Sequence, residues 1–417
     1  MHKKLVFGLF AILVAAALFW GNRPQKCADA ICAQKHSVAP TYGVPGGHPV
    51  GLRVLAMDED PRLKLSLWYP AVEAVGPGTA VGPGTAYAYQ VKLPAVGPVT
   101  LATDEGYATP QAASDLSAGP YPLVILSPGF AMSGSSYGWL AEHLASYGFV
   151  VLSPEHDERM NPESGLWQAA AKRPQEIQAV FAYVDAQVQP GGELAGLVDP
   201  ETVAVVGHSY GGYTALVAAG ARIDSASFAA HCEEAARENH PAAWLCDMLL
   251  PHMSDMADLA GLDAVPEGLW PDWSDPRVDA MISMAGDAFF FGDTGLAEID
   301  VPVLAMGGTA DNDSPYQWST QPSYEQVASP RKARLTLNEA EHMIFTNPCA
   351  SVRWYAIPLA GEFCSDAVWD RQEAHGVISH FATAFLLAEL KQDTHATAVL
   401  APERVEFPQM DYAAQGY

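Results

Sequence analysis

The sequence has few basic residues for its length. Its 417 residues include 22 Lys and Arg against 48 Asp and Glu, which gives a formal net charge of −26 at pH 7. A chain with this charge repels the phosphate backbone of nucleic acids. The composition therefore argues against a nucleic-acid partner, and its acidity is typical of a solvated surface in salty or extracellular surroundings.

Short metal-binding motifs are also lacking. No Cys-x-x-Cys or His-x-x-x-His spacing occurs, so we expect no metal and no organic cofactor. The six cysteines instead fall in three close pairs, which fits an oxidising compartment. We expect local disulfides in the last two pairs, which are Cys232–Cys246 and Cys349–Cys364.

A long apolar run stands at the N-terminus. Two lysines precede the stretch from Leu5 to Trp20. This pattern predicts a signal peptide or a short uncleaved membrane anchor in residues 1–30, and we favour export with cleavage. Cleavage after Ala30 would remove Cys27 and leave Cys32 without its neighbour. The expected location is secreted or periplasmic, with membrane anchoring as the alternative.

Apolar strands alternate with helices from residue 120 onward. An earlier strand is expected at 65–69, after a Pro- and Gly-rich entry at 31–64, and the duplicated hexapeptide at 75–86 is expected to be a surface loop. The pattern predicts an α/β fold in which helices cover both faces of a mostly parallel sheet. The expected strands are 123–126, 149–152, 202–206, 280–284, 301–306 and 333–337, and the expected helices are 135–147, 174–189, 212–220 and 369–390.

One segment interrupts this alternation. Residues 222–276 are rich in His, Met and Trp and contain the pair Cys232 and Cys246. We interpret the segment as a helical insertion over the active site within a single domain of residues 31–417. Its apolar side chains either form a lid or acyl-binding wall, or simply pack as a satellite core.

The strongest motif is Gly207-His-Ser209-Tyr-Gly211. An apolar β-branched strand precedes it and a helix of small residues follows it. A Gly-x-Ser-x-Gly sequence between a strand and a helix is typical of a nucleophile elbow, where the glycines give the tight turn room to present the serine hydroxyl. We therefore expect Ser209 to be a catalytic nucleophile.

A serine nucleophile needs a base, and the base needs an acid that orients it. His342 follows the last expected strand of the alternating series, in the chain position expected for the base. Asp311 follows the strand at 301–306 and is the preferred acid. Asp287, after the preceding strand, is the alternative, and Asp313 is a weaker one.

Two backbone N–H groups are needed to stabilise the oxyanion. Tyr210, directly after the nucleophile, is expected to supply one. Phe130, in the loop after the strand at 123–126, is expected to supply the other. We expect His208 to pack under the elbow, whereas His156 either lines the pocket or is an ordinary loop residue.

These stretches resemble the α/β-hydrolase superfamily. Within it, the chain is similar to dienelactone-hydrolase-like enzymes, platelet-activating-factor acetylhydrolases and bacterial cutinases or polyesterases. The resemblance is carried by 124–130 with 139–151, by the elbow at 207–212, and by 301–311 with His342. It implies an α/β-hydrolase fold and a Ser-His-Asp triad. The acetylhydrolase pattern points to Asp287 as the acid and the cutinase pattern to Asp311.

The expected function is that of an exported serine carboxylic-ester hydrolase (a serine esterase) that acts through an acyl-enzyme on short to medium acyl or lipid-like esters. Polyester, cutin-type or lipase activity is the alternative within enzymes. Cutinases lack the 222–276 insertion, which argues against open access for a solid polymer. A binding protein on an inactive hydrolase scaffold is the alternative outside enzymes. The oligomeric state is left open.

Overall fold

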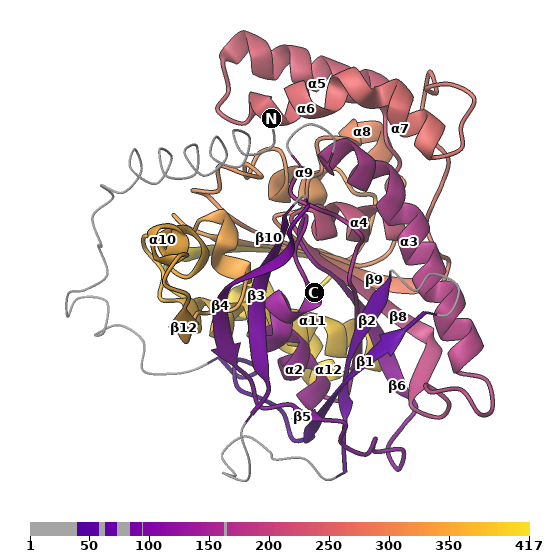
Figure 1. Ribbon diagram of the computed structural model, residues 1–417, viewed down its shortest axis with the longest axis vertical. Coiled ribbons are helices and arrows are strands. Elements are labelled where there is room, and N and C mark those ends of the chain that lie inside the picture. Colours follow the sequence, from indigo (N-terminus) through magenta and orange to yellow (C-terminus); the bar gives the residue numbers. More distant parts are fainter. Residues whose placement is uncertain (1–39, 58–62, 73–83, 94, 162–164) are drawn as a thin grey trace.

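A ten-stranded sheet runs through the part of the chain that the computed structural model describes, which is residues 40–57, 63–72, 84–93, 95–161 and 165–417 (Figure 1). The predicted targeting segment, Cys27 and Cys32 lie outside these residues. The strand order is β13 (Met410–Gln415), β11 (Lys332–Leu337), β10 (Val303–Gly308), β9 (Val278–Met284), β8 (Val198–His208), β6 (Tyr121–Ser127), β7 (Val150–Pro154), β2 (Lys64–Pro70), β1 (Val50–Ala56) and β5 (Thr109–Pro110).

The middle of this sheet is parallel. The six strands from β11 across to β7 all pair in parallel, whereas β13 and β2 join them antiparallel at the two sides. Every expected strand of the alternating series falls on one of the six. The prediction of a mostly parallel α/β sheet is therefore confirmed.

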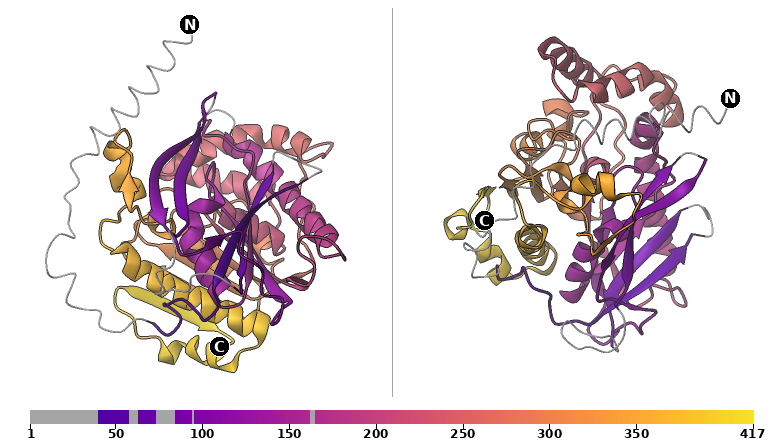
Figure 2. Two further views of the ribbon diagram at one scale, coloured as in Figure 1. Left: turned by 60° about the horizontal axis from the view of Figure 1, so that its bottom comes forward. Right: turned by 60° about the vertical axis from the view of Figure 1, so that its left-hand side comes forward.

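Each face of the sheet carries its own hydrophobic core, because side chains of a strand alternate between faces. Leu123 and Ile125 of β6 belong to one cluster, and Val124 and Leu126 belong to the other; all four are fully buried. Helices cover both faces (Figure 2). The first core contains α3 (Gly165–Gln187) and α4 (Tyr210–Ala218), and the second contains α2 (Gly138–Ser146) and α11 (Arg371–Lys391).

The boundary of α3 differs from the prediction. The sequence suggests a start at Pro174, but the helix begins at Gly165 and Pro174 lies inside it. Proline has no N–H, so the Ala170 carbonyl four residues earlier loses its partner within the helix. The Tyr213 hydroxyl donates to that carbonyl at 2.8 Å, which explains how α3 tolerates the proline.

Several smaller elements surround this framework. The expected entry segment contains β1, and an antiparallel sheet forms that the sequence pattern does not indicate, with β3 (Ala86–Leu93), β4 (Gly97–Glu105) and β12 (Ser351–Val352). The short helices are η2 (Gly134–Tyr137), α8 (Gly292–Leu296), α9 (Thr320–Glu325), η4 (His342–Phe345), η5 (Ile357–Leu359), α10 (Ala360–Phe363), α12 (Thr394–Val399) and η6 (Pro402–Arg404).

The segment at 222–276 is helical and lies beyond α8 and α9 at one end of the molecule (Figure 1). A Cys232–Cys246 disulfide joins its first two helices. Met256 and Trp270 are fully buried and belong to the main core, whereas Trp244 is 42% exposed. Much of the segment therefore packs as core. Its helices are α5 (Ser225–Glu238), α6 (Ala243–Leu249), η3 (Leu250–His252) and α7 (Met253–Leu259).

Among the described residues, none of the helices combines the length and the apolar character that a membrane span requires.

Candidate active site

The candidate nucleophile occupies a sharp turn between β8 and α4. Ser209 has φ 57° and ψ −123°, a backbone conformation that costs a residue with a side chain about 1–3 kcal/mol. The flanking glycines are required by space. A Cβ on Gly207 would lie 2.0 Å from the Gly211 carbonyl oxygen, and one on Gly211 would lie 1.9 Å from that of Ser127. The turn leaves Ser209 partly exposed at the carboxyl edge of the sheet.

The candidate base and acid meet at the same edge. His342 begins η4 after β11, and Asp311 follows β10. His342 Nδ1 lies 2.7 Å from Asp311 Oδ2, so the ring donates to the carboxylate and Nε2 is left to accept a proton. The other Asp311 oxygen accepts the N–H groups of Asp313 and Ser314 at 2.9 and 2.8 Å, which fixes the carboxylate.

The charge of Asp311 governs the basicity of His342. Burial alone lowers the pKa of the imidazole, but the charge and hydrogen bond of Asp311 outweigh that effect and raise it to about 9. A raised pKa is what a general base paired with a buried carboxylate should have. This pair can therefore take up and hold a proton.

The alternative acids occupy different surroundings. Asp287, just after β9, is buried and accepts a hydrogen bond from the Ser314 hydroxyl at 2.7 Å. Burial raises its pKa to about 7, although the Ser314 bond and the neighbouring His342 work in the opposite direction. No hydrogen bond joins either Asp287 or Asp313 to His342 in the part of the chain described. The geometry favours Asp311.

The contact between the elbow and the His342 loop is made by His208, the residue before Ser209, and not by Ser209 itself. His208 Nε2 donates to the His342 carbonyl oxygen at 3.0 Å, and the two rings lie 4.6 Å apart. Burial and the nearby His342 keep the pKa of His208 well below its usual value, so it stays neutral. The Ser209 hydroxyl itself has no hydrogen bond to His342 among the described residues. Such bonds often tighten only when substrate binds.

The two expected oxyanion donors lie next to each other. Tyr210 is the first residue of α4, where backbone N–H groups have no partner within the helix. The rings of Phe130 and Tyr210 are 5.9 Å apart. Within the described residues, neither backbone N–H donates a hydrogen bond to the protein. Both are free to face a substrate oxygen.

Sequence reasoning missed a second serine–histidine–carboxylate array. His156 follows β7; its Nδ1 donates to Glu176 of α3, and its Nε2 accepts from the Ser127 hydroxyl at 3.0 Å. Ser127 is fully buried, and His156 is 1% exposed but contributes to the lining of a cavity that does not include the candidate triad. The three residues come from β6, the loop after β7 and α3, so no local sequence pattern predicts that they meet.

A cavity of about 360 Å³ is lined in part by the loop after β7. Its lining includes Lys92 and Glu155, which lie 3.5 Å apart, but none of Ser209, Asp311 and His342. The candidate triad and this cavity are therefore separate features.

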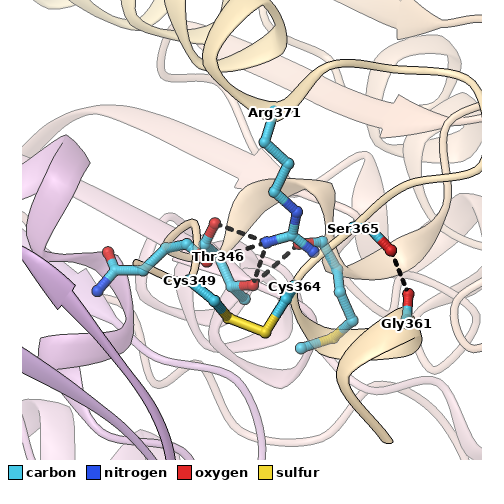
Figure 3. Close-up of a disulfide and its surroundings, with 8 residues drawn as sticks. Thr346, Cys349, Gly361, Cys364, Ser365 and Arg371 are labelled. Atoms are coloured by element: carbon cyan, nitrogen blue, oxygen red, sulfur yellow. Dashed lines mark hydrogen bonds between the residues drawn. A yellow bond between two sulfur atoms is a disulfide. The ribbon is translucent and has the colours of Figure 1, made fainter. Parts of the chain in front are cut away.

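Two anchors hold the loop that carries His342. Asp366 accepts the Glu341 N–H at 2.7 Å. Arg371 donates to the Thr346 carbonyl oxygen at 3.0 Å, beside the Cys349–Cys364 disulfide (Figure 3). Both cysteine pairs expected to form local disulfides do so in the structure. Among the described residues, no group of three or more His, Cys, Asp or Glu could hold a metal ion.

Comparisons with known proteins agree with this architecture. A family model described as PET hydrolase-like matches residues 96–253. A cutinase from Thermobifida alba is 24% identical over 224 residues, which are 53% of this chain and 53% of the relative. A bis(hydroxyethyl) terephthalate hydrolase from Streptomyces coelicolor is 23% identical over 252 residues, or 60% and 59% of the two chains. The chain thus spans little more than half the length of these curated relatives.

A solved structure extends the match in fold. A ferulic acid esterase from Streptomyces cinnamoneus superposes with a TM-score of 0.56 and 22% identity, covering 90% of this chain and 99% of that one. At this identity the likeness concerns the fold alone. Together with the parallel sheet and the strand–serine–helix turn, these comparisons show that the chain has an α/β-hydrolase fold and is similar to cutinases and polyesterases.

Proposed function

We propose that this chain is an exported serine carboxylic-ester hydrolase. The observation that carries the proposal is the 2.7 Å bond between His342 and Asp311 at the sheet edge where the strained Ser209 turn lies. The cutinase and terephthalate-ester hydrolase relatives support ester chemistry. In that chemistry a serine needs a base to become nucleophilic and an acid to orient the base.

In the proposed reaction, Ser209 Oγ attacks the ester carbonyl carbon while His342 Nε2 takes its proton. The carbonyl oxygen becomes an oxyanion that accepts the N–H groups of Phe130 and Tyr210. When the C–O bond to the alcohol breaks, His342 returns the proton to that oxygen. Water then attacks the acyl-enzyme with the same base, which releases the acid and restores Ser209.

The substrates proposed are esters of short to medium acyl chains or lipid-like esters. Aromatic rings of the 222–276 segment reach the loop after Asp311, where His240 stacks on the apolar side chain of Trp318 with ring centroids 4.2 Å apart. Polyester hydrolysis is the second candidate, favoured by the PET hydrolase-like match over residues 96–253.

Export is proposed on independent grounds. The N-terminal apolar run follows the pattern of a signal peptide, and the two disulfides fit an oxidising compartment. Mass spectrometry of the protein recovered from the medium or the periplasm tests this, because cleavage removes about the first 30 residues. Recovery of the intact chain in the membrane fraction would favour anchoring instead.

The test of the activity is hydrolysis of p-nitrophenyl esters from acetate to palmitate by the exported protein. Ser209→Ala should lower kcat at least about 10³-fold, as expected for a triad nucleophile. Ser117→Ala, which changes an exposed serine far along the chain, is the matched control and should not alter kcat. Absence of turnover in the wild type would favour the binding-protein alternative, and equal turnover in Ser209→Ala would contradict Ser209 as the nucleophile.

A further inference from the structure

A buried ion pair lies against the loop that carries Phe130. Arg173 of α3 and Glu158, in the loop after β7, are joined by two hydrogen bonds, with Arg173 Nε 2.6 Å from Oε1 and Nη2 2.8 Å from Oε2. Arg173 is fully buried and Glu158 is 9% exposed. Placing two charges in the interior is unfavourable unless their geometry and remaining hydrogen bonds compensate. The shorter of the remaining bonds go to the Phe130 loop, and two longer ones, each 3.4 Å, go to the hydroxyls of Ser127 and Thr214.

The pair holds both peptide units that flank Phe130. Arg173 donates to the carbonyl oxygens of Pro128 and Gly129 at 2.7 and 3.2 Å. On the other side, Glu158 Oε2 accepts the Ala131 N–H at 2.9 Å. Ala131 has φ 54°, a left-handed conformation that a residue with a side chain adopts only where its surroundings impose it.

Because the peptide group is planar, these contacts also fix the direction in which the Phe130 N–H points. In a trans peptide the C=O and the next N–H lie in one plane and point in opposite directions. The Gly129 carbonyl and the Phe130 N–H belong to the same peptide. Because Arg173 draws that carbonyl inward, the N–H points to the opposite side, away from the guanidinium.

We propose that Arg173 and Glu158 are positioning residues for ester hydrolysis, which aim the Phe130 N–H at the oxyanion. The proposal rests on the function proposed above. Arg173 also reaches the second donor residue, since its guanidinium lies 5.7 Å from the centre of the Tyr210 ring. Burial raises the pKa of Glu158, but the charge of Arg173 outweighs it and lowers the pKa to about 2, so the pair is ionised near neutral pH.

A purely structural pair and a positioning pair differ in what their removal changes. Loss of one oxyanion donor lowers kcat about 10²–10³-fold, because the donor acts on charge that develops in the transition state. Arg173→Lys keeps the charge but loses the planar fork that binds Glu158 and two carbonyls together. We expect its kcat for p-nitrophenyl acetate to fall about 10²-fold with KM changed less than about threefold.

A second readout is binding of phenylboronic acid, which forms a tetrahedral anion on the serine. Its inhibition constant should rise by a factor similar to the loss in kcat, since the adduct uses the same donors. Arg331→Lys is the matched control, because Arg331 also pairs with a carboxylate through two nitrogens, Nε and Nη2, at Glu389 far from the site. It should leave both quantities unchanged.

Folding is separated from positioning by a double variant, Arg173→Met with Glu158→Leu. Replacing both members of a buried pair with apolar residues often leaves stability unchanged, unlike removal of one. We expect a thermal midpoint near that of the wild type with the same loss in kcat. A folded double variant, or Arg173→Lys, with kcat and boronate affinity within threefold of the wild type would overturn the proposal. A wild type without esterase activity would instead overturn the function on which it rests.

Discussion

Two sets of a serine, a histidine and a carboxylate lie at neighbouring strands of the same sheet, and they differ in hydrogen bonding, exposure and backbone strain. Ser127 of β6 pairs in register with Gly207 of β8, two residues before Ser209. Ser127 has a complete set of hydrogen bonds to His156 and onward to Glu176. Ser209 has no such bond yet stands partly exposed on a strained turn.

Hydrogen bonding alone would select Ser127, whereas the proposed function rests on Ser209. Ser127 is the last residue of β6, is fully buried and directly precedes the loop that carries Phe130. Ser209 is followed at once by the free N–H of Tyr210, and its turn faces the His342 loop. Access and adjacent oxyanion donors therefore distinguish a nucleophile from a structural serine.

Replacement of each histidine by glutamine should give the largest difference in kcat between the two sets of residues. His342→Gln removes the base, so kcat for p-nitrophenyl acetate should fall at least about 10⁵-fold. His156→Gln can still hydrogen-bond, and the loss should stay within about tenfold. Equal losses in the two variants would show that the buried array takes part in the chemistry.

Replacement of the two candidate acids, Asp311 and Asp287, should give a smaller difference in kcat. Asp311→Asn removes the charge that orients His342 and stabilises its protonated form, so we expect kcat to fall about 10³–10⁴-fold. Asp287→Asn closely resembles the neutral acid that burial favours at this position, and its loss should stay within about tenfold. Steady-state kinetics on both variants checks the order. A larger loss in Asp287→Asn would make Asp287 the triad acid.

The pH profile should show the mildest effect. The pKa of His342 is raised to about 9, and a protonated ring cannot accept the Ser209 proton, so kcat/KM should climb as the pH rises through that value. The same shift stabilises the fold, fully below pH 6.5, and this contribution is lost as the pH rises from 6.5 through 9. Asp311→Asn should move the kinetic midpoint to lower pH, whereas His156→Gln should not. A midpoint insensitive to Asp311 would contradict this account.

Much of the fold can be predicted from the sequence because buried parallel strands are apolar throughout. The expected strands at 123–126 and 333–337 fall within observed ones, and the one at 149–152 begins one residue before β7. The antiparallel strands β3 and β4 carry alternating and partly polar side chains, and the pattern gives no comparable signal. The predicted start of α3 is wrong because the helix tolerates Pro174 through a tertiary contact. The Tyr213 hydroxyl, 39 residues beyond Pro174, donates to the carbonyl that the proline leaves without a partner, and the sequence pattern does not show this.

The site divides in the same way. The elbow motif selects Ser209 and chain order selects His342, but chain order leaves Asp287 and Asp313 open beside the preferred Asp311. The structure brings Asp311 and His342 within hydrogen-bonding distance. Their catalytic roles stay predictions. No sequence motif marks Arg173 and Glu158. Their contacts join three segments that are separate in the sequence, namely α3, the loop after β7 and the peptide groups of 128–131. Such supporting groups become visible only when the backbone they hold is known.

The central claim is that Ser209, and not Ser127, is the nucleophile. The most direct measurement is labelling of the active protein with a fluorophosphonate, followed by peptide mapping of the adduct. The account predicts one covalent adduct, on the peptide that contains Ser209, and loss of labelling in Ser209→Ala. An adduct on Ser127, or an active esterase that carries no adduct on either serine, would contradict it.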